Sequence, residues 1–263
     1  MNLAISNIAW EQSKDEAVYG LMKEYGFDHI EIAPTRIFPV NPYTYLRRVS
    51  DWAKKMETKG IKPVSMQSIW YGRTENLFSS ESEREKLKNY TKTAIDFAEA
   101  AGIGNLVFGC PKNRVIPDGV SADIAIPFFY ELGEYARSHN ATIGLEANPR
   151  EYNTNFLNTT GDAIMFSERI VSDGIGINLD TGAMVSNGET VSVVKSFVNL
   201  ISHVHISEPF LKPIVQRKLH REVLALLKES GYKGYVSIEM GKCDDISVIE
   251  GALKYLRELN DEL

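Results

Sequence analysis

The chain reads GIGINLDTG at residues 174–182 and HVHISEP at residues 203–209. Both stretches begin with apolar, β-branched residues that favour a β-strand and end with polar residues. TIGLEA at 142–147 and YVSIEM at 235–240 have a similar pattern. Helical patterns separate the four stretches, so the repeating unit is a strand followed by a helix. Few charges occur within the runs, as expected for parallel strands that are buried on both faces.

The same unit extends to the amino-terminal half, where four more strand candidates occur: NLAIS at 2–6, HIEIA at 29–33, KPVSMQ at 62–67 and NLVFG at 105–109. Eight strands in 263 residues leave about 33 residues for each, the size of one strand with its crossover helix. An open doubly wound sheet is the alternative, but no GxGxxG or GxxxxGK[ST] motif opens a helix. The sequence therefore predicts an α/β fold, a single-domain (β/α)8 TIM barrel over residues 1–263.

Glycines mark the predicted ends of several helices. Gly60, Gly102 and Gly231 each follow a helical pattern and precede the next strand by a few residues, as a short connection requires. Ser13 and Glu16 have the spacing of a capping box, which predicts a helix start there.

Composition excludes several classes of protein. The chain is 43% hydrophobic and 24% charged, which argues against a disordered, collagen-like or coiled-coil protein. A net charge of −6 disfavours a nucleic-acid partner, and two cysteines cannot build a disulfide framework. The amino terminus lacks a signal-peptide pattern, and no run of about 18 apolar residues predicts a membrane span. We therefore expect a soluble, cytoplasmic protein without a membrane partner.

Four side chains at the ends of the last four predicted strands could carry the chemistry: Glu146, Asp180, His205 and Glu239. A barrel brings the carboxyl ends of its strands to one face, so these side chains are expected to converge. Three carboxylates that lie close together at the carboxyl end of a barrel repel each other unless a cation lies among them. Carboxylate oxygens with one imidazole suit a single divalent ion, namely Mn²⁺, Mg²⁺, Co²⁺ or Zn²⁺. His203, two residues earlier on the strand, is interpreted as a core histidine.

With GLEANP, INLDTG, HVHISEP and GYKGYVSIEM (231–240), the chain resembles the xylose isomerase-like TIM barrel family of sugar (phosphate) isomerases and epimerases. FGCPKNR (108–114) and NPREYNTNFLNTT (148–160) resemble a poorly characterised branch of it. The resemblance implies one divalent metal bound by the four residues above, with Glu146 and Glu239 also moving the proton. It further implies a carbohydrate-like small-molecule substrate and a homodimer or homotetramer. Many members carry a histidine three residues after the strand-six aspartate, where this chain has Ala183, and this leaves the substrate class open.

Several residues near strand ends are candidates for substrate binding. Lys112 and Arg114 could hold a phosphate or carboxylate, and Trp70 could stack on a sugar ring. Asn148 and Glu208 complete the predicted substrate-binding set, Glu208 with an alternative role in positioning His205. Glu31, at the end of the second strand, could bind substrate hydroxyls or hold a loop.

The reaction class stays open at this point. Proton abstraction next to a carbonyl would lead to epimerisation or isomerisation through an enediolate, or to dehydration by a metal-dependent lyase. A catalytically inactive binding barrel is a further alternative. An AP endonuclease-type enzyme is disfavoured, because it uses many histidines and a basic face, whereas this chain has five histidines and a net charge of −6.

Overall fold

The computed structural model describes residues 1–263 and forms a closed barrel of eight parallel strands in the order β1 to β8. The barrel closes where β8 pairs with β1, with Leu3 beside Val236. The strands are β1 (Asn2–Ser6), β2 (His29–Ile32), β3 (Lys62–Met66), β4 (Asn105–Phe108), β5 (Thr142–Glu146), β6 (Ile175–Asp180), β7 (Ile201–Ser207) and β8 (Tyr235–Glu239). The predicted (β/α)8 fold is confirmed, and every predicted strand agrees with the structure to within two residues at each end.

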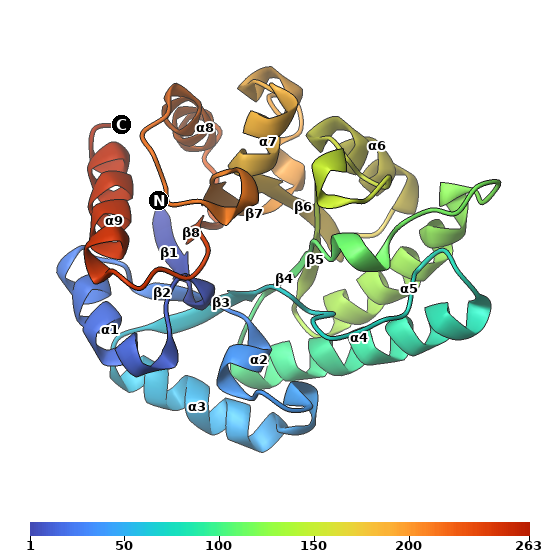
Figure 1. Ribbon diagram of the computed structural model, residues 1–263, viewed down its shortest axis with the longest axis horizontal. Helices are drawn as coiled ribbons and strands as arrows, with labels where there is room; N and C mark the ends of the chain where they lie inside the picture. Colours follow the sequence, from blue (N-terminus) through green and yellow to red (C-terminus); the bar gives the residue numbers. More distant parts are fainter.

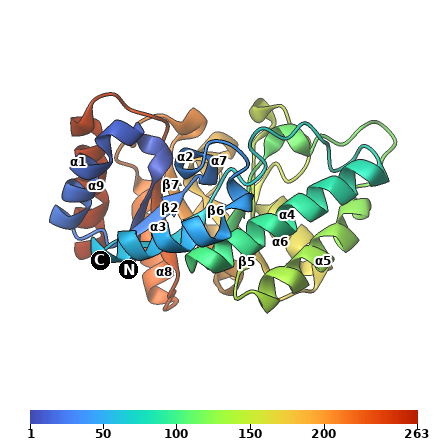
Figure 2. The ribbon, with the colours of Figure 1, turned by 90° about the horizontal axis from the view of Figure 1, so that it is seen from below.

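Helices surround the barrel as a ring (Figure 1). They are α1 (Asp15–Glu24), α2 (Pro34–Ile37), α3 (Leu46–Thr58), α4 (Glu81–Ala101), α5 (Ala125–Ser138), α6 (Thr160–Ile170), α7 (Thr181–Asn187), α8 (Lys218–Glu229) and α9 (Ile246–Asp261). Figure 2 shows α3 and α4 packed along the outside of the barrel. The two chain ends are close together, because the Met1 ammonium donates a hydrogen bond to Asn260 Oδ1 at 2.9 Å. None of these helices has the length and apolar character needed to cross a membrane.

One continuous apolar cluster of 62 buried residues joins the strands to the helices, so both layers share a single core. The helix boundaries differ from the prediction at α1. A 3₁₀ turn over Gln12–Lys14 precedes it, and its N-cap, Lys14, makes no side-chain cap, so the predicted capping box at Ser13 does not form. A capping box does form at α6, where the Thr159 and Asp162 side chains each accept from the other's backbone N–H.

Strand register places the polar strand residues together. Residues two apart on a strand point to the same face. Pairing sets Asp180 of β6 beside His205 of β7, and His205 beside Ser237 of β8. Glu146, the last residue of β5, is beside Asn178 of β6. The four predicted metal ligands therefore lie at the carboxyl end of the barrel on adjoining strands.

The fold depends on a close approach between α5 and the start of β6. A Cβ added to Gly174 would lie 1.8 Å from the backbone carbonyl oxygen of Gly133. We expect Gly174→Ala to lower the free energy of unfolding by about 1–3 kcal/mol or more, because backbone must move to make room. Gly20→Ala is the matched control: it lies in α1 with no atom within 4 Å of the added methyl, and it should stabilise by about 0.5–1 kcal/mol. Urea unfolding measures both, and equal effects of the two would contradict the packing argument.

Candidate metal centre

His205 is the centre of a cluster of three carboxylates. Its Nδ1 atom lies 3.2 Å from Glu146 Oε2, 3.2 Å from Glu239 Oε2 and 3.8 Å from Asp180 Oδ2. The His205 side chain is fully buried, whereas the three carboxylates keep 10–12% of their side-chain surface exposed. The structure thus brings together all four residues that the sequence singled out as metal ligands.

The donor set fits a divalent ion. Ligand atoms of Glu146, Asp180 and His205 all lie within 4.8 Å of one another, and Glu239 approaches the same nitrogen. Ligands held roughly 2.0–2.2 Å from one ion lie roughly 3.0–3.5 Å apart, which is close to the separations around His205 Nδ1. Three carboxylate oxygens and one imidazole nitrogen suit Mn²⁺, Mg²⁺, Co²⁺ or Zn²⁺. These four residues would hold the ion.

Side-chain amides and a hydroxyl hold the carboxylates in place. Asn178 Nδ2 donates to Glu146 Oε2 at 2.6 Å, and Asn148 Nδ2 donates to Glu146 Oε1 at 3.1 Å. Ser207 Oγ donates to Asp180 Oδ2 at 2.5 Å. Sequence reasoning missed Asn178 and Ser207. Their spacing shows only that each shares a face with a candidate ligand, because each lies two residues from one on the same strand.

Asp180 has a second, structural contact. It is the N-cap of α7, where its Oδ1 accepts the backbone N–H of Ala183 at 2.6 Å. Burial, together with the neighbouring Glu146 and Glu239 carboxylates, raises the pKa of Asp180 to about 7. Ala183, which departs from the family pattern, is buried beside the cavity and contributes its backbone to this cap.

The other ionisable groups of the cluster are perturbed as well. Burial raises the pKa of Glu239, although His205 acts in the opposite direction. Burial alone would lower the pKa of His205, but the Glu239, Glu31 and Glu146 carboxylates hold it well above its ordinary value. The cluster therefore carries an excess of acidic groups that a bound cation would compensate.

A cavity of about 660 Å³ opens over the carboxylates. Glu146, Asp180 and Glu239 form part of its floor, and the loops after β3 and β4 form one wall. Of the predicted substrate-binding residues, Lys112, Asn148, Trp70 and Glu208 line this cavity. Lys112 forms no ion pair, whereas Arg73, the other basic residue of the lining, is paired with Glu75.

Arg114 is placed differently from the prediction. Its side chain is fully buried and is absent from the cavity lining. Its Nη1 donates to the Glu146 backbone carbonyl at 3.0 Å, and its guanidinium carbon lies 5.4 Å from the centre of the Phe108 ring. Burial lowers the pKa of Arg114 to about 10. The structure therefore does not place Arg114 at the cavity surface with Lys112, and the side chain contacts the Glu146 backbone instead.

Two other candidates line the cavity with their polar atoms already engaged. Trp70 donates its Nε1–H to Thr91 Oγ1 at 2.7 Å and packs edge-on against Phe108. Glu208 is ion-paired with Arg217, whose Nε lies 2.7 Å from Glu208 Oε1. No hydrogen bond or ion pair joins Glu208 to His205. The structure therefore gives no support to the alternative role of Glu208 in positioning that histidine.

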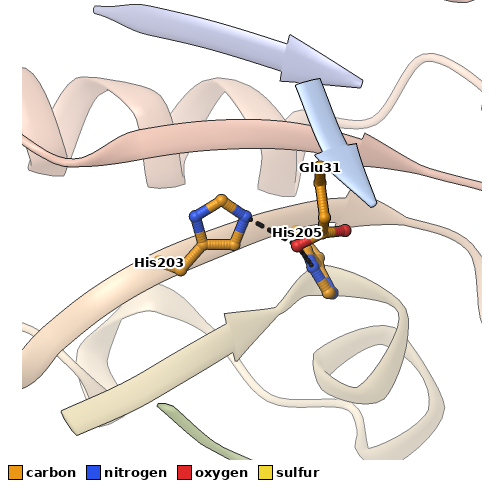
Figure 3. A group of neighbouring side chains, drawn as sticks. All are labelled: Glu31, His203 and His205. Carbon is orange, nitrogen blue, oxygen red and sulfur yellow. Dashed lines mark hydrogen bonds and ion pairs between the residues drawn. The ribbon is translucent and has the colours of Figure 1, made fainter. Parts of the chain in front are cut away.

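The partner of His205 is instead Glu31, which lies between two histidines (Figure 3). Glu31 Oε2 is 3.0 Å from His205 Nε2 and 3.1 Å from His203 Nε2, and all three side chains are fully buried. Burial would raise the pKa of Glu31, but the two imidazoles hold it well below its ordinary value. This trio is a second arrangement of potential metal ligands. The Nε2 atom of each histidine already lies within 3.1 Å of the Glu31 carboxylate, and none of the three residues lines the cavity.

A comparison with known families agrees with this geometry. The family model described as xylose isomerase-like TIM barrel matches residues 20–259, most of the chain. The chain belongs to the xylose isomerase-like TIM barrel family. The resemblance stated from the sequence motifs is thereby confirmed. No curated protein matches this sequence.

Solved structures of related fold include enzymes of different activities. A D-psicose 3-epimerase from Clostridium cellulolyticum H10 superposes with a TM-score of 0.80 at 16% identity, over 99% of each chain. The IOLI protein with a bound zinc atom has a TM-score of 0.73 at 18% identity, covering 100% of this chain and 97% of its own. A family 2 AP endonuclease from Brucella melitensis has a TM-score of 0.73 at 16% identity, covering 98% and 99%. At these identities the likeness is one of fold.

Proposed function

We propose that this protein is a divalent-metal-dependent epimerase or isomerase of a keto-sugar, a sugar phosphate or a related polyhydroxy compound. The observation that carries the proposal is the convergence of Glu146, Asp180 and Glu239 on His205 Nδ1 at the floor of an open cavity. Membership of the family and the likeness to a ketose 3-epimerase support the same class of reaction.

Glu146 and Glu239 are the proposed acid and base. They come from β5 and β8, which are not neighbours in the barrel, so they approach the cavity from different sides. Glu146 accepts two amide hydrogen bonds, which hold its carboxylate in place. Glu239 has a raised pKa, which suits a group that returns a proton. In the reverse direction the two roles exchange.

A bound divalent ion would supply Lewis-acid stabilisation of the negative charge that develops as the substrate C–H bond breaks. Return of the proton to the same carbon from the opposite face is epimerisation. Return to the adjacent carbon is aldose–ketose isomerisation. Epimerisation by this route needs a proton-transfer group on each face of the substrate carbon, and the cavity lining offers Glu146 and Glu239.

The cavity suits a small hydroxylated substrate. Its volume of about 660 Å³ lies inside the range of about 300–1,000 Å³ that is usual for small-molecule sites. Polar side chains of its walls include Gln67, Ser68, Thr74, Asn113 and Asn148. With Arg114 buried, Lys112 is the remaining predicted residue that could contact an anionic group of the substrate.

Exchange of a substrate proton with solvent tests the proposal. The metal-loaded protein is incubated in D₂O with D-fructose, D-psicose, D-tagatose, L-ribulose and ketose phosphates, and the products are followed by NMR. We expect deuterium to enter at a carbon next to the carbonyl of at least one substrate as its epimer or isomer forms. Conversion with complete retention of the original hydrogen would contradict proton transfer through Glu146 and Glu239.

A further inference from the structure

Glu31 is a buried carboxylate that the proposed reaction does not use. It lies on β2, immediately after the point where the register between β2 and β3 shifts. Such irregularities re-aim a side chain and are frequent next to active sites. The Glu31 side chain is fully buried and points to β7, where His203 and His205 are two residues apart on the same face (Figure 3). A carboxylate is retained in such a place only if its partners compensate for the lost hydration.

Glu31 forms a hydrogen bond with only one of its two histidine neighbours. His205 Nε2 forms a hydrogen bond with Glu31 Oε2 at 3.0 Å. His203 Nε2 approaches the same oxygen at 3.1 Å, but its alignment is too poor for a hydrogen bond. Gln67 Nε2 donates to the other oxygen, Oε1, at 3.2 Å. With both oxygens engaged, the carboxylate is fixed, and His205 is the histidine that it holds by a directed bond.

This bond determines what the rest of the His205 ring can do. A carboxylate only accepts, so the proton of the contact belongs to Nε2 of His205. When a cation displaces the other ring proton, the imidazole is neutral with one N–H and one lone pair, and the lone pair is then on Nδ1. Nδ1 is the nitrogen that faces Glu146, Asp180 and Glu239. Nε2 of His205 therefore donates to Glu31, while Nδ1 faces the proposed metal site.

We propose that Glu31 is the positioning residue of the metal centre: by accepting the Nε2–H of His205 it fixes the tautomer and the ring plane in which Nδ1 is the metal donor. This inference rests on the proposed function, because it concerns the same centre. Glu31 touches neither the cavity nor the three carboxylates, so it acts through His205 alone. His203 packs edge-on against His205, with ring centres 5.3 Å apart, and its Nε2 lies near the same Glu31 oxygen.

Glu31→Gln tests the proposal, because the amide keeps the size of the side chain and removes its charge. We expect Mn²⁺ affinity, measured by titration calorimetry, to fall about 10–100-fold. The matched control is Glu189→Gln, a carboxylate outside the cavity that accepts from Thr160 N at 3.1 Å and Thr160 Oγ1 at 2.7 Å. It should bind Mn²⁺ as the unsubstituted protein does. Equal affinity in Glu31→Gln and the control would overturn the proposal.

A spectroscopic readout separates positioning from a merely structural role. In protein with ¹⁵N-labelled histidine and bound ¹¹³Cd²⁺, we expect cadmium coupling at Nδ1 of His205 and a protected, hydrogen-bonded proton at Nε2. That proton resonance should shift upfield and exchange faster in Glu31→Gln. Coupling of cadmium to Nε2 would overturn the proposal, and this measurement on the unsubstituted protein decides it even where the variant fails to fold.

The same spectra distinguish this inference from the proposed function. If no divalent ion binds to the unsubstituted protein, the proposed function fails. The Nε2 proton of His205 is still observable in the metal-free protein, where its protection and its dependence on Glu31 decide whether the carboxylate holds the ring. Loss of protection in Glu31→Gln supports the positioning role, and an unprotected proton in the unsubstituted protein overturns it.

Discussion

Glu239→Gln is expected to lower the rate of net epimerisation about 10²–10⁴-fold, the contribution typical of one general acid–base group. The amide keeps the shape of the side chain near His205 but cannot carry a proton between substrate and solvent. The measurement is the conversion rate of whichever substrate shows exchange in D₂O, at saturating metal. Glu189→Gln serves again as the control and should convert substrate at the unsubstituted rate.

A sharper result is expected from the two epimers taken separately. An epimerase with two proton-transfer groups exposes the hydrogen of each epimer to a different carboxylate. Glu239→Gln should therefore still exchange deuterium into the epimer whose hydrogen faces Glu146, without converting it into the other epimer. Glu146→Gln should do the same for the opposite epimer.

Both residues are also proposed metal ligands, so metal content must be measured beside exchange. If either variant retains its metal yet exchanges neither epimer, the two-carboxylate mechanism is contradicted. If both variants lose the metal and the exchange together, exchange of both epimers that returns on saturation with Mn²⁺ would assign the two residues to ligation alone and contradict the two-carboxylate mechanism.

The sequence was sufficient for the barrel and for the four converging side chains. Strands buried on both faces are short, apolar runs, and their regular spacing made eight units visible. A carboxylate or imidazole at the end of such a run stands out, and Glu146, Asp180, His205 and Glu239 all do. Their proximity follows from topology, because parallel strands of a barrel end at one face.

The supporting residues could not be obtained in this way. Asn178 and Ser207 are neutral, and nothing in a strand pattern shows whether such a residue bonds to a ligand or to backbone. Arg114 is in a loop segment, where basic residues are usually solvated, and only the three-dimensional packing over Phe108 shows that it is buried. Glu31 and His205 are separated by 174 positions in the sequence, so their hydrogen bond depends on the closure of the barrel.

Asp180→Asn is expected to weaken Mn²⁺ binding by at least about 100-fold, since loss of a direct ligand should exceed the effect of losing an outer partner. The variant should fold. Its amide oxygen can still accept the N–H of Ala183 in the first turn of α7, and asparagine is a good N-cap. Ser207, which donates to the Asp180 carboxylate, can rotate its hydroxyl to accept from the new amide.

The pH dependence of binding gives an independent test of the same residue. A proton and a metal ion compete for a carboxylate, so metal affinity rises with pH until the group is ionised. The pKa of Asp180 is raised to about 7 in the metal-free protein. Mn²⁺ affinity should therefore increase steeply up to about pH 7, and it should continue to rise above that pH while the metal still displaces a proton from His205, whose pKa is also raised.

In Asp180→Asn the part of this slope that belongs to Asp180 should vanish, while the weaker affinity stays. Calorimetry in buffers of different ionisation enthalpy counts the released protons at each pH. A variant that binds Mn²⁺ weakly but releases as many protons as the unsubstituted protein would place the titrating group on Glu239 or His205, whose pKa values are also raised. A variant with unchanged affinity would remove Asp180 from the ligand set, because a carboxylate that shares the ion with His205 cannot be neutralised without loss of binding.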